Sequence, residues 1–249
     1  MRKLLGSVVV AMLVGGLKAM TPAQAARRDE VPPSFSNAWQ VGWVLDVAAD
    51  RAGNVYSIID DWGGSLVRKY SANGSLLAQW GGGGAGDGQF SQATGIGVDG
   101  TGNVYVADSG NDRIQKFSPD GTFLDGWGGA GNLPGAFESP SDVAVDAVGN
   151  VYVVDSGNDR IQRFSAHGTF LNQWSVDLAF GFPYYNTIAV DDSGDVLVLG
   201  PAGLTRFTPD GAVVSELPLE GGGGIALDPA GHIYVAVSND HQIRKYAPD

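Results

Sequence analysis

One pattern recurs along the chain: an apolar run, Asp-x-x-Gly-Asn, a β-branched run, a polar loop and a strand that ends in an aromatic residue. The clearest copies begin at Gly95 and Asp142. The turns that align the copies contain, in order, Gly53, Gly102, Gly149, Gly194 and Gly231. Their spacing of 37 to 49 residues predicts a supersecondary unit that buries its faces only against neighbouring copies.

The second copy shows how one unit folds. Strands are predicted at Thr94–Val98, Val104–Ala107, Arg113–Ser118 and Phe123–Trp127, and turn residues separate each pair. We name these strands a to d. The repeat length is typical of a four-stranded propeller blade, and the sequence therefore predicts an all-β propeller with five blades.

The end of the chain predicts how the ring closes. The fifth copy ends its strand c at Tyr246 and has no strand d of its own. Near the N-terminus, Phe35 and Trp39 have the four-residue spacing of the aromatic pairs in the other d strands. We therefore expect Ser34–Gln40 to complete the last blade and to leave no open sheet edge.

The N-terminus has the features of a secretory signal peptide. Arg2 and Lys3 precede an apolar stretch that ends at Leu17, and Ala23-Gln24-Ala25 offers a cleavage site. The apolar stretch is shorter than the roughly 20 residues of a membrane-spanning helix, so an uncleaved anchor is the alternative. The predicted organisation is a signal peptide at 1–25, a flexible N-terminus at 26–33 and the propeller at 34–249.

Composition limits the partners. The formal net charge of −12 disfavours nucleic acids and acidic lipids, and the chain has no cysteine for disulfides or thiolate metal sites. We expect a secreted or periplasmic bacterial protein that is monomeric, does not insert into the membrane once the signal is removed, and meets a protein or glycan in the envelope or outside.

An aspartate follows strand a in every copy. A ring of these carboxylates near the axis would suit a structural calcium ion, and no other cofactor is expected. The alternative is that each aspartate accepts backbone N–H bonds from its own turn, and the sequence favours this interpretation. The five residues are Asp50, Asp99, Asp146, Asp191 and Asp228.

The candidate binding face consists of the loops between strands b and c and the connections from strand d to the next strand a. The loops between strands b and c are nearly identical in the second and third copies, and each contains an Asp and an Arg. This repetition favours a structural role, in which the pair orders the loop, and the alternative is that the pair binds a polar ligand. The candidate residues in these loops are Asp60, Asp61, Trp62, Asp108, Asn111, Arg113, Asp155, Asn158, Arg160 and His241.

Aromatic residues gather in the fourth d–a connection. Phe180, Tyr184 and Tyr185 are additional to the repeat pattern and, with Trp62, are candidates for an exposed patch that binds a protein or glycan. Local packing of a longer connection is the alternative explanation.

The chain resembles the NHL repeat family of β-propellers. The resemblance is carried by GDGQF at Gly86–Phe90, by GNVYVADSGNDRIQKF at Gly102–Phe117 and by Gly121–Trp127, and it covers essentially all of the chain after the signal. The family usually closes with six blades, and the fourth copy departs from its loop motif at Leu199–Gly203. The resemblance implies a propeller, with members that bind RNA or protein, that sense extracellular signals or that act as lyases.

The leading interpretation is an exported, non-enzymatic binding or scaffold propeller whose ligand, a protein or glycan, meets the b–c and d–a face. His167 and His232 belong to turns on the face opposite His241, so the three histidines do not form a catalytic zinc site. The alternative is a metal-dependent lyase or lactonase-type enzyme with its site at the central channel.

Overall fold

The structure of the protein is a computed structural model that describes residues 43–61, 64–178, 186–219, 222–237 and 241–248. The predicted signal peptide, the flexible N-terminus and the predicted closing strand Ser34–Gln40 lie outside these residues. No helix in the described ranges has the length and apolar character needed to cross a membrane.

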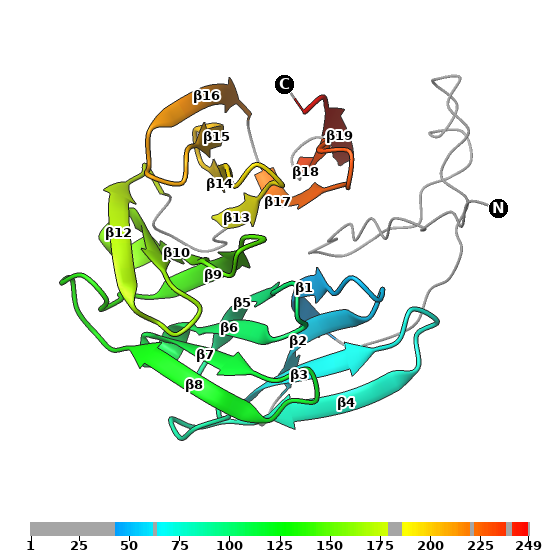
Figure 1. The fold of residues 1–249 in the computed structure, drawn as a ribbon. Helices are drawn as coiled ribbons and strands as arrows, with labels where there is room; N and C mark the ends of the chain where they lie inside the picture. The colour runs from blue at the N-terminus through cyan, green and yellow to red at the C-terminus, as the bar shows by residue number, and fades with distance from the viewer. Residues whose placement is uncertain (1–42, 62–63, 179–185, 220–221, 238–240, 249) are drawn as a thin grey trace.

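Five antiparallel sheets are arranged around a central axis, which confirms the predicted five-bladed propeller (Figure 1). Four sheets have four strands each, and the fifth has three within the described residues. Sheet 1 comprises β1 (Trp43–Ala49), β2 (Val55–Asp61), β3 (Gly64–Tyr70) and β4 (Leu76–Gly81). Sheet 2 comprises β5 (Ala93–Val98), β6 (Val104–Asp108), β7 (Arg113–Phe117) and β8 (Phe123–Gly128).

The remaining sheets follow the same order. Sheet 3 comprises β9 (Pro140–Val145), β10 (Val151–Asp155), β11 (Arg160–Phe164) and β12 (Phe170–Ser175). Sheet 4 comprises β13 (Thr187–Val190), β14 (Val196–Gly200), β15 (Gly203–Phe207) and β16 (Val213–Pro218). Sheet 5 comprises β17 (Gly222–Leu227), β18 (Ile233–Val237) and β19 (Gln242–Tyr246). The first strand of each sheet lies nearest the axis (Figure 1).

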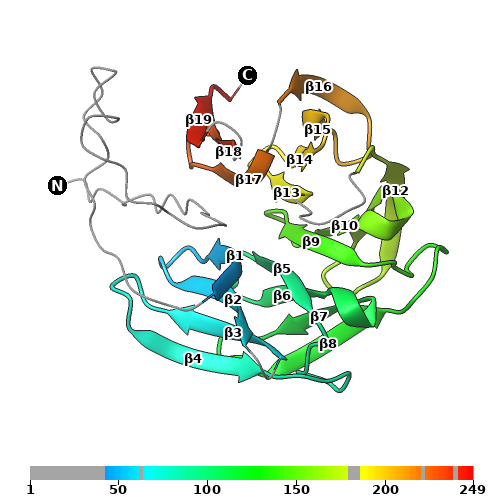
Figure 2. The ribbon, with the colours of Figure 1, turned by 180° about the vertical axis from the view of Figure 1, so that it is seen from behind.

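The two short 3-10 turns, η1 (Ser109–Asn111) and η2 (Ser156–Asn158), are parts of the b–c loops of sheets 2 and 3. They lie on the side of the ring that faces the viewer in Figure 2. The b–c loops and d–a connections share this side, which we call the loop face.

Aromatic side chains join neighbouring sheets. The ring of Trp80 on β4 lies 5.8 Å from that of Phe117 on β7, and Trp127 and Phe164 repeat this contact at 5.9 Å. The turn glycine Gly121 lies so close to Trp80 that an added Cβ would be 2.5 Å from the indole, and its φ is +89°. A side chain at this turn would therefore clash as well as strain the backbone. Sheet 2 thus supplies Phe117 to the contact with the preceding blade and Trp127, ten residues further along the chain, to the contact with the following blade.

The aspartate turns are confirmed as structural. Asp99 Oδ1 accepts the backbone N–H groups of Thr101 and Asn103 at 2.8 and 2.9 Å. Burial alone would raise the pKa of Asp99, but hydrogen bonds from the side chains and the backbone N–H groups of Thr101 and Asn103 lower it below its ordinary value. The other four aspartates accept equivalent pairs of backbone bonds, so each carboxylate closes its own hairpin.

Candidate functional site

The loop face is organised around a buried carboxylate in sheet 2. Asp108, at the end of β6, has no exposed surface. Its Oδ2 accepts bonds from Arg113 Nε at 2.8 Å, Asn111 Nδ2 at 2.8 Å and Gln115 Nε2 at 3.1 Å. Its Oδ1 accepts the backbone N–H of Ser91 at 2.9 Å. This carboxylate therefore holds the b–c loop and the preceding d–a connection together.

The guanidinium beside it extends the network. Arg113 Nη2 donates to the backbone carbonyls of Gly86 and Gln89 at 2.8 and 3.0 Å. In sheet 3, Asp155 and Arg160 form the same pair at 2.7 Å, and Arg160 donates to the carbonyl of Ala136 at 2.8 Å. We call each Asp, Arg and Gln set, with its loop asparagine, an interblade lock.

Six of the predicted binding residues therefore belong to two interblade locks, as the structural interpretation of the sequence proposed. They are Asp108, Asn111, Arg113, Asp155, Asn158 and Arg160. Their polar atoms bond within the protein, and contact with a ligand stays a prediction.

The other predicted binding residues are less fully described. Asp60 is exposed near the end of β2, and His241 is exposed with a left-handed φ of 54°. The side chain of Asp61 is not described, and Trp62, Phe180, Tyr184 and Tyr185 lie outside the described residues. The aromatic patch therefore stays a prediction.

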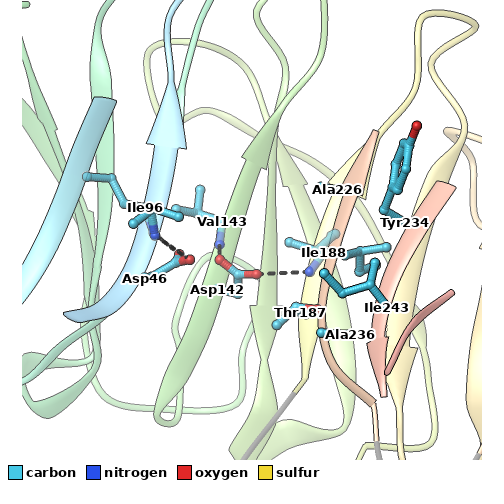
Figure 3. Close-up of a pocket in the computed structure, with 13 residues that line it drawn as sticks. Asp46, Ile96, Asp142, Val143, Thr187, Ile188, Ala226, Tyr234, Ala236 and Ile243 are labelled. Carbon is cyan, nitrogen blue, oxygen red and sulfur yellow. Dashed lines mark hydrogen bonds between the residues drawn. The ribbon is translucent and has the colours of Figure 1, made fainter. Parts of the chain in front are cut away.

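A second candidate site lies on the propeller axis. Residues from all five inner strands line a cavity of about 100 Å³. Figure 3 shows the carboxylates of Asp46 and Asp142 at this cavity, among apolar side chains such as Ile96 and Ile188. The hydroxyl oxygen of Thr187, which also lines the cavity, is buried and has no hydrogen-bond partner among the described residues.

Each axial carboxylate connects two blades. Asp46 accepts the N–H of Val47 at 2.7 Å and that of Ile96, in the next sheet, at 2.8 Å. Asp142 bonds likewise to Val143 and to Ile188 of the next sheet, at 2.7 and 2.9 Å (Figure 3). The backbone amides thus hold both acids in fixed positions at the cavity.

Burial makes these two acids hard to ionise. It raises the pKa of Asp46 to about 7, although the bonds from Ile96 and Val47 oppose the shift. Burial also raises the pKa of Asp142 well above its usual range, and the nearby charge of Asp46 raises it further. The pair therefore retains a proton near neutral pH, a condition that suits proton transfer, whereas a bound cation would have to displace that proton.

Sequence reasoning missed Asp46 and Asp142, although the repeat contained a signal. Each of these aspartates directly precedes a central apolar residue of strand a. At the position of the aspartate, the other copies have Gly95, Thr187 and Gly224. An acid at an inward position of an innermost strand must face the axis or a neighbouring blade. The carboxylates nearest the axial cavity are therefore these two and not the five turn aspartates.

Metal-binding side chains are dispersed and not clustered in the described ranges. No cluster of three or more His, Asp or Glu side chains there could hold a metal ion. His232 Nδ1 lies 2.9 Å from Asp228 Oδ2 within an a–b turn, whereas His241 belongs to a b–c loop. The histidines thus lie in the turns and loops that the sequence predicts.

Comparison with known proteins agrees with this geometry. The family model described as NHL repeat matches residues 90–117 and 137–164, which are the segments that carry the two interblade locks. No curated protein sequence matches the chain.

Several solved structures share the fold. A protein of unknown function from Bacteroides caccae is 15% identical, with a TM-score of 0.62 over 83% of this chain and 78% of that one. Virginiamycin B lyase from Staphylococcus aureus is 12% identical, with a TM-score of 0.55 over 82% and 69%. The WD40 repeats of RRP9 are 14% identical, with a TM-score of 0.61 over 86% and 62%. At these identities the likeness concerns the fold alone.

The sheet order and the axial arrangement define the class: this protein is a five-bladed β-propeller. Within that class, residues 90–117 and 137–164 match the NHL repeat, so this propeller contains two segments of NHL-repeat type.

Proposed function

We propose that this protein is an exported, non-enzymatic binding propeller whose loop face meets a protein or glycan partner in the bacterial envelope or outside the cell. The observation that carries the proposal is the pair of interblade locks, which fix the b–c loops and the d–a connections with hydrogen bonds centred on the buried carboxylates of Asp108 and Asp155. The N-terminal signal pattern supports export.

Fixed loops favour recognition because binding then orders few groups. The d–a connection held by Arg160 also presents Leu133, whose side chain is 72% exposed. Glu138 is exposed in the same connection, and such a mixture of apolar and polar groups is typical of protein interfaces.

A matched pair of variants tests this face. Leu133→Ser alters the loop face, and Val148→Ser alters an a–b turn on the opposite face, where Val148 is 85% exposed. Immobilised parent protein should retain a partner from envelope extract or a glycan array, Leu133→Ser should weaken that capture, and Val148→Ser should not. Equal loss with both variants, or no capture above background, would contradict the proposal.

The axial acids favour a second candidate, a metal-dependent lyase or lactonase-type enzyme. Asp46, Asp142 and the Thr187 hydroxyl, which has no partner in the described part of the chain, supply oxygen ligands at one cavity. Oxygen ligands suit a hard cation, but calcium takes six to eight of them, so water or substrate would complete the set. Elemental analysis and melting with and without EDTA test this candidate, and protein that holds no metal and melts unchanged in EDTA would rule it out.

A further inference from the structure

Sheet 4 lacks the interblade lock. The last residue pair between strands b and c is Asp108 with Arg113 in sheet 2, but Gly200 with Gly203 in sheet 4. Two residues further along strand c, Thr205 takes the place of Gln115. The three side chains that join sheets 2 and 3 to their preceding connections are therefore missing or shortened in sheet 4.

A cavity of about 290 Å³ is lined by the residues at these three positions, although the backbone of β16 occupies the direction in which a Cβ at Gly203 would point. It lies between the segment that follows β12 and the outer strands of sheet 4. Gly200, Gly203 and Thr205 line it, together with Asp177 and Glu216. The carbonyl oxygen of Asp177 would lie 3.1 Å from a Cβ at Gly200, so a backbone acceptor also faces this position.

The chain's own arginine on β15 does not fill the space. Arg206 donates to Asp191 at 2.6 Å and to Asp195 at 2.9 Å, and both acids belong to the a–b turn at the opposite end of the sheet. None of the described lining residues carries a positive charge, whereas Asp177 and Glu216 are exposed acids. Among the described residues, the cavity thus has acceptors and negative charge but no cation.

We infer that this cavity, the sheet 4 pocket, receives the guanidinium group of an arginine side chain from a protein partner. In sheets 2 and 3 the residues at the strand positions that match Gly203 are Arg113 and Arg160, and each guanidinium group bonds to a carboxylate and to backbone carbonyls of the preceding connection. Arginine suits such a site because its planar group offers five donors that stay charged. The inference rests on the proposed binding function and specifies the partner as a protein with an exposed arginine.

Two capped peptides provide the probes: Gly-Gly-Arg-Gly-Gly and its lysine counterpart. Titration of full-length protein, followed by NMR or calorimetry, should show tighter binding of the arginine peptide. Asp177→Asn should weaken that binding about fivefold, the effect of one exposed charged pair. The control Asp87→Asn removes an exposed acid from a connection in which the lock is intact, and it should leave binding unchanged.

A filling variant provides an independent readout. Thr205→Arg places a guanidinium on strand c inside the pocket and should abolish arginine-peptide binding while the protein stays folded by circular dichroism. Equal binding of both peptides, no binding of either one, or unchanged binding by Thr205→Arg would overturn the inference.

The two proposals fail in different ways. If the arginine peptide does not bind but partner capture still depends on Leu133, the sheet 4 pocket is refuted and the loop-face function stands. If the peptide binds the pocket but Leu133→Ser and Val148→Ser capture the partner equally, the loop-face assignment is refuted instead.

Discussion

The stability of the ring should depend strongly on one buried carboxylate. Asp155 is fully buried, and its Oδ2 accepts bonds from Arg160 at 2.7 Å, Asn158 at 2.9 Å and Gln162 at 3.0 Å. Its Oδ1 accepts the N–H of Glu138 at 2.7 Å. Asp155→Asn removes the negative charge and turns one acceptor into a donor that faces other donors.

The expected cost follows from what remains buried. Arg160 is 6% exposed and would keep its carbonyl bonds but lose the one carboxylate that it contacts among the described residues. Breaking a buried ion pair by removing one partner typically costs 3–5 kcal/mol, and Asn keeps one acceptor oxygen. We therefore expect Asp155→Asn to lower the free energy of unfolding by about 3 kcal/mol in urea titrations followed by tryptophan fluorescence.

Asp159→Asn is the matched control. It makes the same chemical change four residues away in the same loop, but Asp159 is exposed, and Asn tolerates its left-handed φ of 49°. The control should stay within about 0.5 kcal/mol of the parent. Limited proteolysis should also cleave Asp155→Asn faster near Leu133, because Arg160 holds that connection. Equal stabilities of the two variants would refute the view that the lock stabilises the ring.

Two further predictions concern the axis and the closure of the ring. The unfolded chain should lose the Asp46 proton near pH 3.8 and the folded chain near pH 7, because burial raises the folded pKa. Asp46 should therefore make stability fall as pH rises through this window, by about 1.4 kcal/mol per pH unit. Urea titrations across pH should show a smaller fall in Asp46→Asn, and identical slopes would contradict this cause. Trp39→Ala should cost about 3–5 kcal/mol, because the sequence places Trp39 in the strand that closes sheet 5; a melting temperature within one or two degrees of the parent would refute that closure.

The fold could be predicted largely because its determinants are local and repeated. The strand predicted at Val104–Ala107 is β6 at Val104–Asp108, and the one predicted at Phe123–Trp127 is β8 at Phe123–Gly128. Apolar runs and turn residues fix these elements within one copy, and the repetition then supplies the number of blades.

The candidate sites could be predicted only in part, because their contacts cross between copies. The sequence identified Asp108 and Arg113 as a pair, but it did not show that Arg113 reaches the connection at Gly86. Nor did it identify Asp46 and Asp142, which meet at one cavity although nearly a hundred residues separate them. Distances across a ring depend on its closure and curvature, which no single repeat encodes.

The contact between a turn glycine and the tryptophan of the preceding blade has a consequence for how the number of blades can change. Gly121 receives Trp80 from the sheet before it, and Gly168 receives Trp127 in turn. One copy of the repeat thus supplies both a glycine that packs against the preceding blade and a tryptophan that packs against the following one. A tandem duplication of residues 94–140 would carry a matching surface on each side. Such a duplication could therefore add one blade to the propeller without requiring a new type of interface.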